Sequence, residues 1–383
     1  MVGGALKDTN DRVWTRIVQS GGGANSRFGV ITAGSIPATQ DPNSNSASCD
    51  NSECNGKYYA GLLKKFGASF AEWIPVDLDH KDSAEDTTLA DKVRGYTGFF
   101  VGGGDQSRYI ECLLKSDQKT DTAVLAAVRA AVKGGAGIAG SSAGTAILQS
   151  GPMITGGESY YGIRDGTYSR PSDNPDNVTY RSSGGWGFFN TGLLDTHFGA
   201  RGRHGRLIRL LSDTRNTLGF GIDEDTALIA SGGSLTVMGT NNVNVIDLKA
   251  ASTGSSSSWS INGVKWSLLS DGDKIDPVSG KVSSSRLARA VGESAAFSAT
   301  LDSTDIFSSP DNTDSSGARR HPYEIVLVAQ DMIKAGYRTS LSETYETNPI
   351  YRVSLTKGST FQKWQGQLDA VSFKDITINI YKS

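Results

Sequence analysis

The sequence has few of the residues that would point to a special class of protein. Among its 383 residues are three cysteines, four histidines and ten prolines. No cluster of Cys and His has the spacing of a metal site, and scarce proline without a G-X-Y period excludes a collagen-like chain. No apolar run reaches the roughly 18 residues that a transmembrane helix needs. A net charge of −2 gives no reason to expect nucleic acid or an anionic membrane as the main partner.

Glycine, in contrast, is abundant. The 46 glycines are about 12% of the chain, against a usual share of about 7%. We expect them at tight turns, at strand ends and where the backbone approaches a ligand closely. Hydrophobic residues make up 37% and charged residues 20%, which is enough apolar material for a large core and excludes a chain that is disordered throughout.

The hydrophobic pattern changes along the chain. Up to about residue 150 it predicts helices at 8–19, 58–66, 89–94 and 122–133, alternating with strands at 28–33, 71–76 and 98–101. Such alternation is typical of a parallel sheet with helices on both faces. From about residue 226 the pattern predicts mainly strands, at 227–230, 234–238, 243–248, 323–328, 350–355 and 373–380. The sequence therefore predicts an α/β core followed by a β-rich part.

A G-x-S-x-G motif lies at Gly140–Gly144, between a short apolar strand and a helical segment. This context is that of a nucleophile elbow, in which the central Ser142 occupies a strained turn and the N–H of Ala143 can stabilise negative charge. Ser141 competes only by composition. In a chain so rich in Gly and Ser, about one such motif is also expected by chance, so the strand–turn–helix context carries the functional interpretation.

A serine nucleophile needs a base, and four histidines are available. His80 lies in an acidic stretch, and His321 lies beside two arginines in the C-terminal part. His197 and His204 remain, and His197 ends an apolar run, where α/β enzymes place catalytic groups. Taken alone, a histidine in this position is more often a core residue with its hydrogen bonds satisfied.

An arginine cluster follows His197. Arg201, Arg203 and Arg206 crowd one short segment of an otherwise neutral chain. Guanidinium groups bind carboxylates in a bidentate manner, so the cluster fits recognition of an acidic substrate, with a solvated helix face as the alternative. The acidic residues 223–225 have two open interpretations, a hydrogen-bonding cluster at a strand end or a contact for a substrate cation.

Several separated motifs together resemble one family. They are residues 102–106 (GGGDQ), 140–144 (GSSAG), 153–157 (MITGG), 195–198 (DTHF) with the following arginines, 221–227 (GIDEDTA) and 268–273 (LLSDGD). This combination resembles the cyanophycinases, in the serine peptidase family that includes peptidase E. The resemblance covers residues 1–283. It implies a flavodoxin-like three-layer sandwich, related to class I glutamine amidotransferases, with insertions near 37–56 and 160–190. Residues 284–383 are then a β-rich C-terminal extension packed on this core.

The resemblance also implies roles for single residues. Ser142 is the nucleophile, His197 the base and Glu158 the acid of the triad, with Asp165 and Asp195 as competing acids. The oxyanion hole consists of the N–H groups of Gly103, Gly104 and Ala143. The substrate contacts are Gln106, Asp195, Thr196, Arg201, Arg203, Arg206 and Glu224, the last for a guanidinium. Cyanophycinases commonly have Gln where this chain has Thr196, so substrate preference can differ.

The implied activity is that of a serine-type exopeptidase without a cofactor. It hydrolyses cyanophycin, a poly-aspartate with arginine on each side chain, to β-Asp-Arg dipeptides. The alternatives are a related peptidase for aspartyl dipeptides or isopeptides, and a non-catalytic binding protein on the same fold. Polar loops and a sequon at Asn177 favour an extracellular location over a cytoplasmic one. The extension is open to granule binding or to homodimer formation, and Cys49 and Cys54 are close enough in sequence for a small disulfide.

Overall fold

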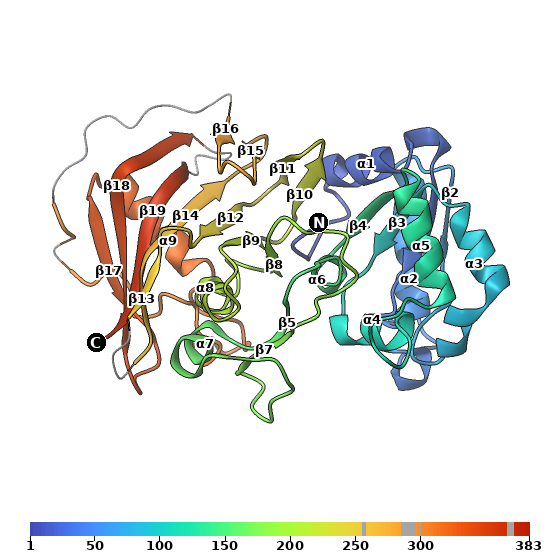
Figure 1. Ribbon diagram of the computed structural model, residues 1–383, viewed down its shortest axis with the longest axis horizontal. Helices are drawn as coiled ribbons and strands as arrows, with labels where there is room; N and C mark the ends of the chain where they lie inside the picture. The colour runs from blue at the N-terminus through green and yellow to red at the C-terminus, as the bar shows by residue number, and fades with distance from the viewer. Residues whose placement is uncertain (255–257, 285–295, 299, 366–370) are drawn as a thin grey trace. The chain divides into compact units, whose positions relative to one another are not determined.

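The computed structural model describes residues 1–254, 258–284, 296–298, 300–365 and 371–383 (Figure 1). The chain divides into two compact units. The first comprises Met1–Ser150 and Ser183–Phe188, and the second comprises Gly151–Ser182 and Phe189–Ser383. Among the described residues, no helix has both the length and the apolar character needed to cross a bilayer.

The first unit is built on a four-stranded parallel sheet. Its strands are β1 (Arg27–Ile31), β2 (Phe70–Trp73), β3 (Gly98–Val101) and β4 (Gly137–Gly140), in the order β2-β1-β3-β4. Its helices are α1 (Asp11–Ser20), α2 (Ser52–Lys65), α3 (Thr87–Arg94), α4 (Gln106–Leu113), α5 (Ala123–Lys133) and the short α6 (Ala143–Ala146), with 3₁₀ turns η1 (Gly23–Asn25), η2 (Ala38–Gln40) and η3 (Lys81–Glu85). This strand order is the beginning of the flavodoxin-like order 2-1-3-4-5.

Helices cover both faces of this sheet. On one face, Trp14 of α1 contacts the rings of Tyr59, Phe66 and Phe100. Parallel crossovers are right-handed, and the chain reverses its direction across the sheet after β2, so α3 and α5 lie on the face opposite α2. The predicted α/β arrangement is therefore confirmed. Cys49, in the polar segment before α2, forms a disulfide with Cys54 in the first turn of α2.

The second unit contains a mixed eight-stranded sheet. Its path is β17 (Thr339–Glu343), β18 (Tyr351–Gln365), β19 (Val371–Lys382), β14 (Ser260–Leu269), β12 (Val243–Asp247), β9 (Leu218–Ile222) and β8 (Leu193–Thr196), with β13 (Ser252–Gly254) also on β14. Smaller sheets are formed by β10 (Thr226–Ser231), β11 (Ser234–Gly239), β15 (Lys274–Ile275) and β16 (Val282–Ser283), and by β5 (Met153–Gly156), β7 (Val178–Arg181) and β6 (Thr167–Tyr168). The helices are α7 (Ser159–Asp165), α8 (His204–Asp213) and α9 (Glu324–Lys334).

The C-terminal residues complete this large sheet. Strand β14, which belongs to the predicted core, pairs with β19 of the predicted extension. The division into two units therefore does not coincide with the predicted boundary at residues 283 and 284. Residues 285–295, at the start of the predicted extension, lie outside the described part of the chain. The strands predicted at 350–355 and 373–380 are present as parts of β18 and β19.

The strand predicted at 323–328 is wrong, because this segment begins helix α9. A short apolar run has the same appearance in a buried strand and in a buried helix. The full helix shows its period: its buried residues are Ile325, Val326, Val328, Ala329, Gln330, Met332 and Ile333. They recur at helical spacing, and all of them except Gln330 belong to one core cluster with Trp266 and Phe373 of the large sheet.

Candidate active site

Ser142 occupies a sharp turn between β4 and α6 in the first unit. Its backbone has φ 54° and ψ −118°, a conformation that a non-glycine residue adopts only at a cost of about 1–3 kcal/mol. The side chain is half-buried. Strain of this kind is characteristic of a nucleophile elbow, where it holds the serine hydroxyl away from the surrounding backbone.

The two glycines of the motif are required by close backbone packing. A Cβ on Gly140 would lie 2.1 Å from the carbonyl oxygen of Gly144. A Cβ on Gly144 would lie 2.1 Å from the carbonyl oxygen of Val101, at the end of β3. The buried hydroxyl of Thr145 ties this turn to the N-terminal segment, since it lies 2.6 Å from the oxygen of Gly140 and 2.7 Å from that of Val2. The G-x-S-x-G spacing is thus a packing requirement of this turn.

The glycine-rich loop after β3 lies beside Ser142. A Cβ built on Gly103 would lie 3.7 Å from the Cβ of Ser142. Gly104 has φ 117°, and a side chain there would collide with the carbonyl of Gly34 at 2.1 Å. The loop continues into α4, which Asp105 caps by accepting the N–H of Ser107 at 2.8 Å. The glycine-rich loop and the G-x-S-x-G turn therefore lie at the carboxyl ends of β3 and β4, which is where open α/β sheets bind ligands.

His197 lies in the second unit, directly after β8. Its Nδ1 is 2.7 Å from Oε1 of Glu224, which follows β9 by two residues. Strands β8 and β9 are parallel neighbours, so their carboxyl ends meet at one edge of the sheet. A carboxylate only accepts hydrogen bonds, so Nδ1 carries the proton and Nε2 is left as the basic atom.

The electrostatics keep the imidazole neutral. Burial lowers the pKa of His197, and the charges of Arg201 and Arg203 lower it further, while the bond to Glu224 partly opposes this. The hydrogen bond from His197 in turn lowers the pKa of Glu224. At neutral pH the pair is therefore a neutral imidazole oriented by an ionised carboxylate, which is the arrangement of a general base and its third partner.

The predicted triad acids are engaged elsewhere. Glu158 Oε1 pairs with Arg319 Nη2 at 2.9 Å. Asp165 accepts both Nε and Nη2 of Arg164, at 2.8 and 2.7 Å. The structure thus brings Glu224, rather than Glu158 or Asp165, to Nδ1 of His197. Both His197 and Glu224 closely follow an apolar strand, and this shared position was the available signal in the sequence.

Asp195 and Arg206 form a buried ion pair. Arg206 Nε and Nη2 donate to the two carboxylate oxygens at 2.8 and 2.5 Å, and Nη1 donates to the carbonyl of Gly157 at 2.7 Å. Their side chains are only 3% and 4% exposed. Burial alone would raise the pKa of Asp195, but the charge of Arg206 and its hydrogen bonds bring it below the ordinary value. These two predicted substrate contacts therefore bind each other inside the unit.

The other predicted substrate contacts differ in exposure. Thr196 is buried, and its carbonyl accepts Nη1 of Arg203 at 2.7 Å. Burial lowers the pKa of Arg203 to about 9. Arg201 is exposed, which leaves its guanidinium accessible to a ligand. Gln106, the first residue of α4 in the first unit, is half-buried.

His204 belongs to the core. Its Nε2 lies 3.0 Å from Oδ1 of Asn244, and its ring packs against Phe198 and Trp266. Burial lowers the pKa of His204 to about 3, so it stays neutral. Of the two histidines that the sequence left as candidate bases, only His197 pairs with a carboxylate among the described contacts.

Asp223, Arg319 and Tyr323 hold the loop after His197, a role that the sequence did not indicate. The N–H of Gly199 donates to Oδ1 of Asp223 at 2.7 Å, and its carbonyl accepts the N–H of Tyr323 at 2.9 Å. Arg319 donates to the carbonyl of Arg201 at 3.1 Å. Burial raises the pKa of Asp223 to about 7. The 223–225 cluster is thus in part the predicted strand-end hydrogen-bonding cluster, and the C-terminal residues clamp the histidine loop.

The described residues contain no group of three or more His, Cys, Asp or Glu side chains that could hold a metal ion. The chemistry offered by these residues is instead that of a strained serine, a neutral histidine paired with a carboxylate, and an exposed arginine.

Comparison with known proteins agrees with this chemistry. Residues 52–238 match peptidase family S51. The cyanophycinase of Trichormus variabilis is 31% identical over 194 residues, which are 50% of this chain and 58% of that protein. The cyanophycinase of Synechococcus elongatus is 28% identical over 281 residues, which are 71% of this chain and 76% of that protein.

The match thus spans somewhat more than half of the length of the first of these relatives. A solved structure of a peptidase from an acI-B1 Actinobacterium has a TM-score of 0.49 at 17% identity, covering 72% of this chain and 94% of that one. Residues 52–238 are therefore similar to peptidase family S51, and the chain is similar to cyanophycinases over half or more of its length.

Proposed function

We propose that the chain is a serine-type peptidase that hydrolyses cyanophycin to β-Asp-Arg dipeptides through an acyl-enzyme on Ser142. The observation that carries the catalytic part is the strained turn at Ser142, beside which lies the loop of Gly103 and Gly104. The named relatives support the substrate class, because both are cyanophycinases.

In the proposed mechanism, Ser142 Oγ attacks the amide carbonyl and His197 Nε2 takes its proton. This step requires the two atoms to come within hydrogen-bonding reach during catalysis. The N–H groups of Ala143 and of Gly103 or Gly104 stabilise the oxyanion. The imidazolium then protonates the leaving amine, and water releases the acyl group by the reverse sequence of proton transfers.

We assign the orienting role to Glu224 in place of Glu158. The 2.7 Å contact with Nδ1 of His197 supports this assignment. Its negative charge stabilises the imidazolium that forms during attack, as the third member of a triad does. Glu224 is then no longer needed as the contact for a substrate guanidinium.

Arg201 and Gln106 remain as proposed substrate contacts. Each repeat of the polymer presents a free arginine carboxylate, and an exposed guanidinium such as that of Arg201 fits it by a bidentate contact. Asp195, Arg206 and Arg203 act on the shape of the loop rather than on the substrate, since Asp195 and Arg206 bind each other and Arg203 Nη1 donates to the carbonyl of Thr196. Secretion and homodimer formation stay predictions.

The test compares purified wild-type protein with Ser142→Ala on insoluble cyanophycin, on α-aspartyl dipeptides and with a serine-directed covalent inhibitor. We expect the wild type to solubilise the polymer and to be labelled at Ser142, and the variant to be folded but inactive. Activity retained by Ser142→Ala would refute the nucleophile. Cleavage of α-aspartyl dipeptides alone would replace the substrate, and neither labelling nor hydrolysis would identify a binding protein.

A further inference from the structure

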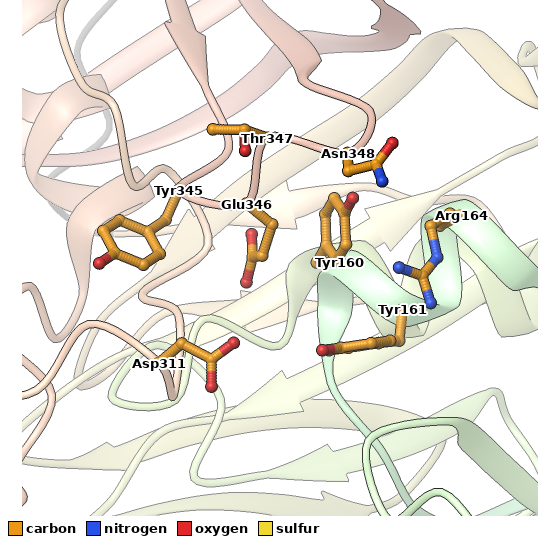
Figure 2. A pocket seen from close by; sticks show the side chains of 8 residues that line it. All are labelled: Tyr160, Tyr161, Arg164, Asp311, Tyr345, Glu346, Thr347 and Asn348. Atoms are coloured by element: carbon orange, nitrogen blue, oxygen red, sulfur yellow. The ribbon is translucent and has the colours of Figure 1, made fainter.

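A cavity lies within the second unit and contains none of the proposed catalytic residues. It has a volume of about 520 Å³, within the usual range for small-ligand sites of about 300–1,000 Å³. Its lining residues are Tyr160, Tyr161, Arg164, Asp311, Tyr345, Glu346, Thr347 and Asn348 (Figure 2). The first three come from α7, and the other five come from the C-terminal residues, so the cavity exists only because the two segments pack together.

The cavity carries two carboxylates that form no ion pair with any described residue, Glu346 and Asp311. Glu346 accepts a hydrogen bond from the hydroxyl of Ser309 at 2.6 Å, and Asp311 is exposed. Among the described residues neither carboxylate forms an ion pair. Burial raises the pKa of Glu346, and the neighbouring charges of Asp305 and Asp311 add to this rise. A cation in the cavity would relieve this repulsion.

The walls of the cavity are aromatic, and the protein already places a guanidinium on two of them. The guanidinium carbon of Arg164 lies 5.4 Å from the ring centre of Tyr160 and 4.8 Å from that of Tyr161. Its charge is balanced by the bidentate pair with Asp165. Figure 2 shows Glu346 between this group and Tyr345 on the opposite side. The ring of Tyr345 is 44% exposed and accessible to a second planar cation.

We propose that this cavity binds the guanidinium group of an arginyl side chain, stacked on Tyr345 and paired with Glu346 and Asp311. A guanidinium suits the site better than an ammonium, because it is planar, weakly hydrated and able to bind a carboxylate through two N–H groups. The source of the group rests on the proposed function: it is an arginyl unit of the polymer that is not being cleaved. The cavity then anchors an insoluble substrate while its end is hydrolysed.

The direct test measures binding of arginine amide and lysine amide to full-length Ser142→Ala protein by calorimetry or NMR titration. We expect arginine amide to bind several-fold more tightly than lysine amide. The double variant Asp311→Asn/Glu346→Gln, which preserves side-chain size, should weaken this binding at least tenfold. Asp331→Asn is the matched control, because this carboxylate is 79% exposed and pairs with Lys334 on α9. Undiminished binding in the double variant, or equal binding of the two amides, would overturn the proposal.

A second arm separates this inference from the proposed activity. In otherwise wild-type protein, the double variant should raise KM for cyanophycin about tenfold and leave kcat unchanged. Cleavage of a short oligomer of β-Asp-Arg units, which does not extend to the cavity, should not change. If the wild type fails to hydrolyse cyanophycin, the proposed function fails, while the amide titration still decides whether the cavity binds guanidinium. If hydrolysis of the polymer is identical in the double variant, the anchoring role is refuted.

Discussion

Replacing Glu224 by glutamine removes the negative charge that faces His197 and preserves the size of the side chain. The 2.7 Å contact supplies both the orientation of the imidazole and the stabilisation of its charged form. In serine hydrolases the equivalent change lowers kcat by about 10⁴, which corresponds to about 5 kcal/mol of transition-state stabilisation. We expect a loss of this order in Glu224→Gln, measured as the rate of dipeptide release from cyanophycin.

The pH profile gives an independent readout of the same contact. The carboxylate of Glu224 raises the pKa of His197 against the lowering effect of burial. Without this charge the pKa of His197 falls further, so the acidic limb of kcat/KM should move to lower pH although the rate itself falls. If Glu224 only bound a substrate guanidinium, its replacement by glutamine would instead raise KM and leave this limb unchanged.

Glu158→Gln is the matched control, since Glu158 carries the same charge in the same unit and pairs with Arg319. We expect it to change kcat by less than about tenfold and to leave the acidic limb where it is. Near-normal activity of Glu224→Gln, or a larger loss in Glu158→Gln, would refute the assignment of the acid.

Three further perturbations test the rest of the site. Asp195→Asn leaves Arg206 buried without a counter-charge and should lower the free energy of unfolding by about 3–5 kcal/mol in denaturant titrations. In the wild type, the stabilisation from this ion pair should persist at neutral pH and disappear in acid, as the pH falls through the lowered pKa of Asp195. Gly144→Ala should destabilise the protein by about 1–3 kcal/mol and abolish activity, because its Cβ would meet a β3 carbonyl at 2.1 Å. The control Gly61→Ala, on an open face of α2, should instead stabilise the protein by about 0.5–1 kcal/mol. Equal effects of the two substitutions would contradict the packing argument. Arg319→Ala releases the histidine loop and should lower kcat on the order of 10- to 100-fold with little change in melting temperature, and an unchanged kcat would remove the clamp from the mechanism.

The sequence was informative where local chemistry decides the structure. The strained turn at Ser142 follows from Gly140 and Gly144, since only glycine tolerates the carbonyl contacts at 2.1 Å. The alternation of strands and helices before residue 150 was read correctly, because each buried element shows its own period over four or more residues. The strand predicted at residues 323–328 is wrong because this apolar run is too short to show its period, and without its continuation it fits a strand and a helix equally well.

Pairing between distant residues was beyond the sequence. Glu158, Asp165, Asp195 and Glu224 are equivalent as carboxylates, and the position of Glu224 after an apolar strand does not by itself place it against His197. Asp195 and Glu158 are instead paired with arginines that lie 11 and 161 residues away in the sequence. The sequence likewise does not distinguish the members of the arginine cluster, although Arg206 forms a buried ion pair and Arg201 is exposed.

The sequence by itself therefore determined the strained turn at Ser142, the candidate base and the α/β character of the first unit. Each of these depends on steric limits and on hydrophobic periods within a few residues of the chain. Only the tertiary structure decided which carboxylate contacts His197, that Arg206 is interior, and that C-terminal residues contact the histidine loop and line the cavity beside α7. These outcomes depend on which strand ends become neighbours in the sheet and on which charges lose access to water, and both arise only when the chain is folded.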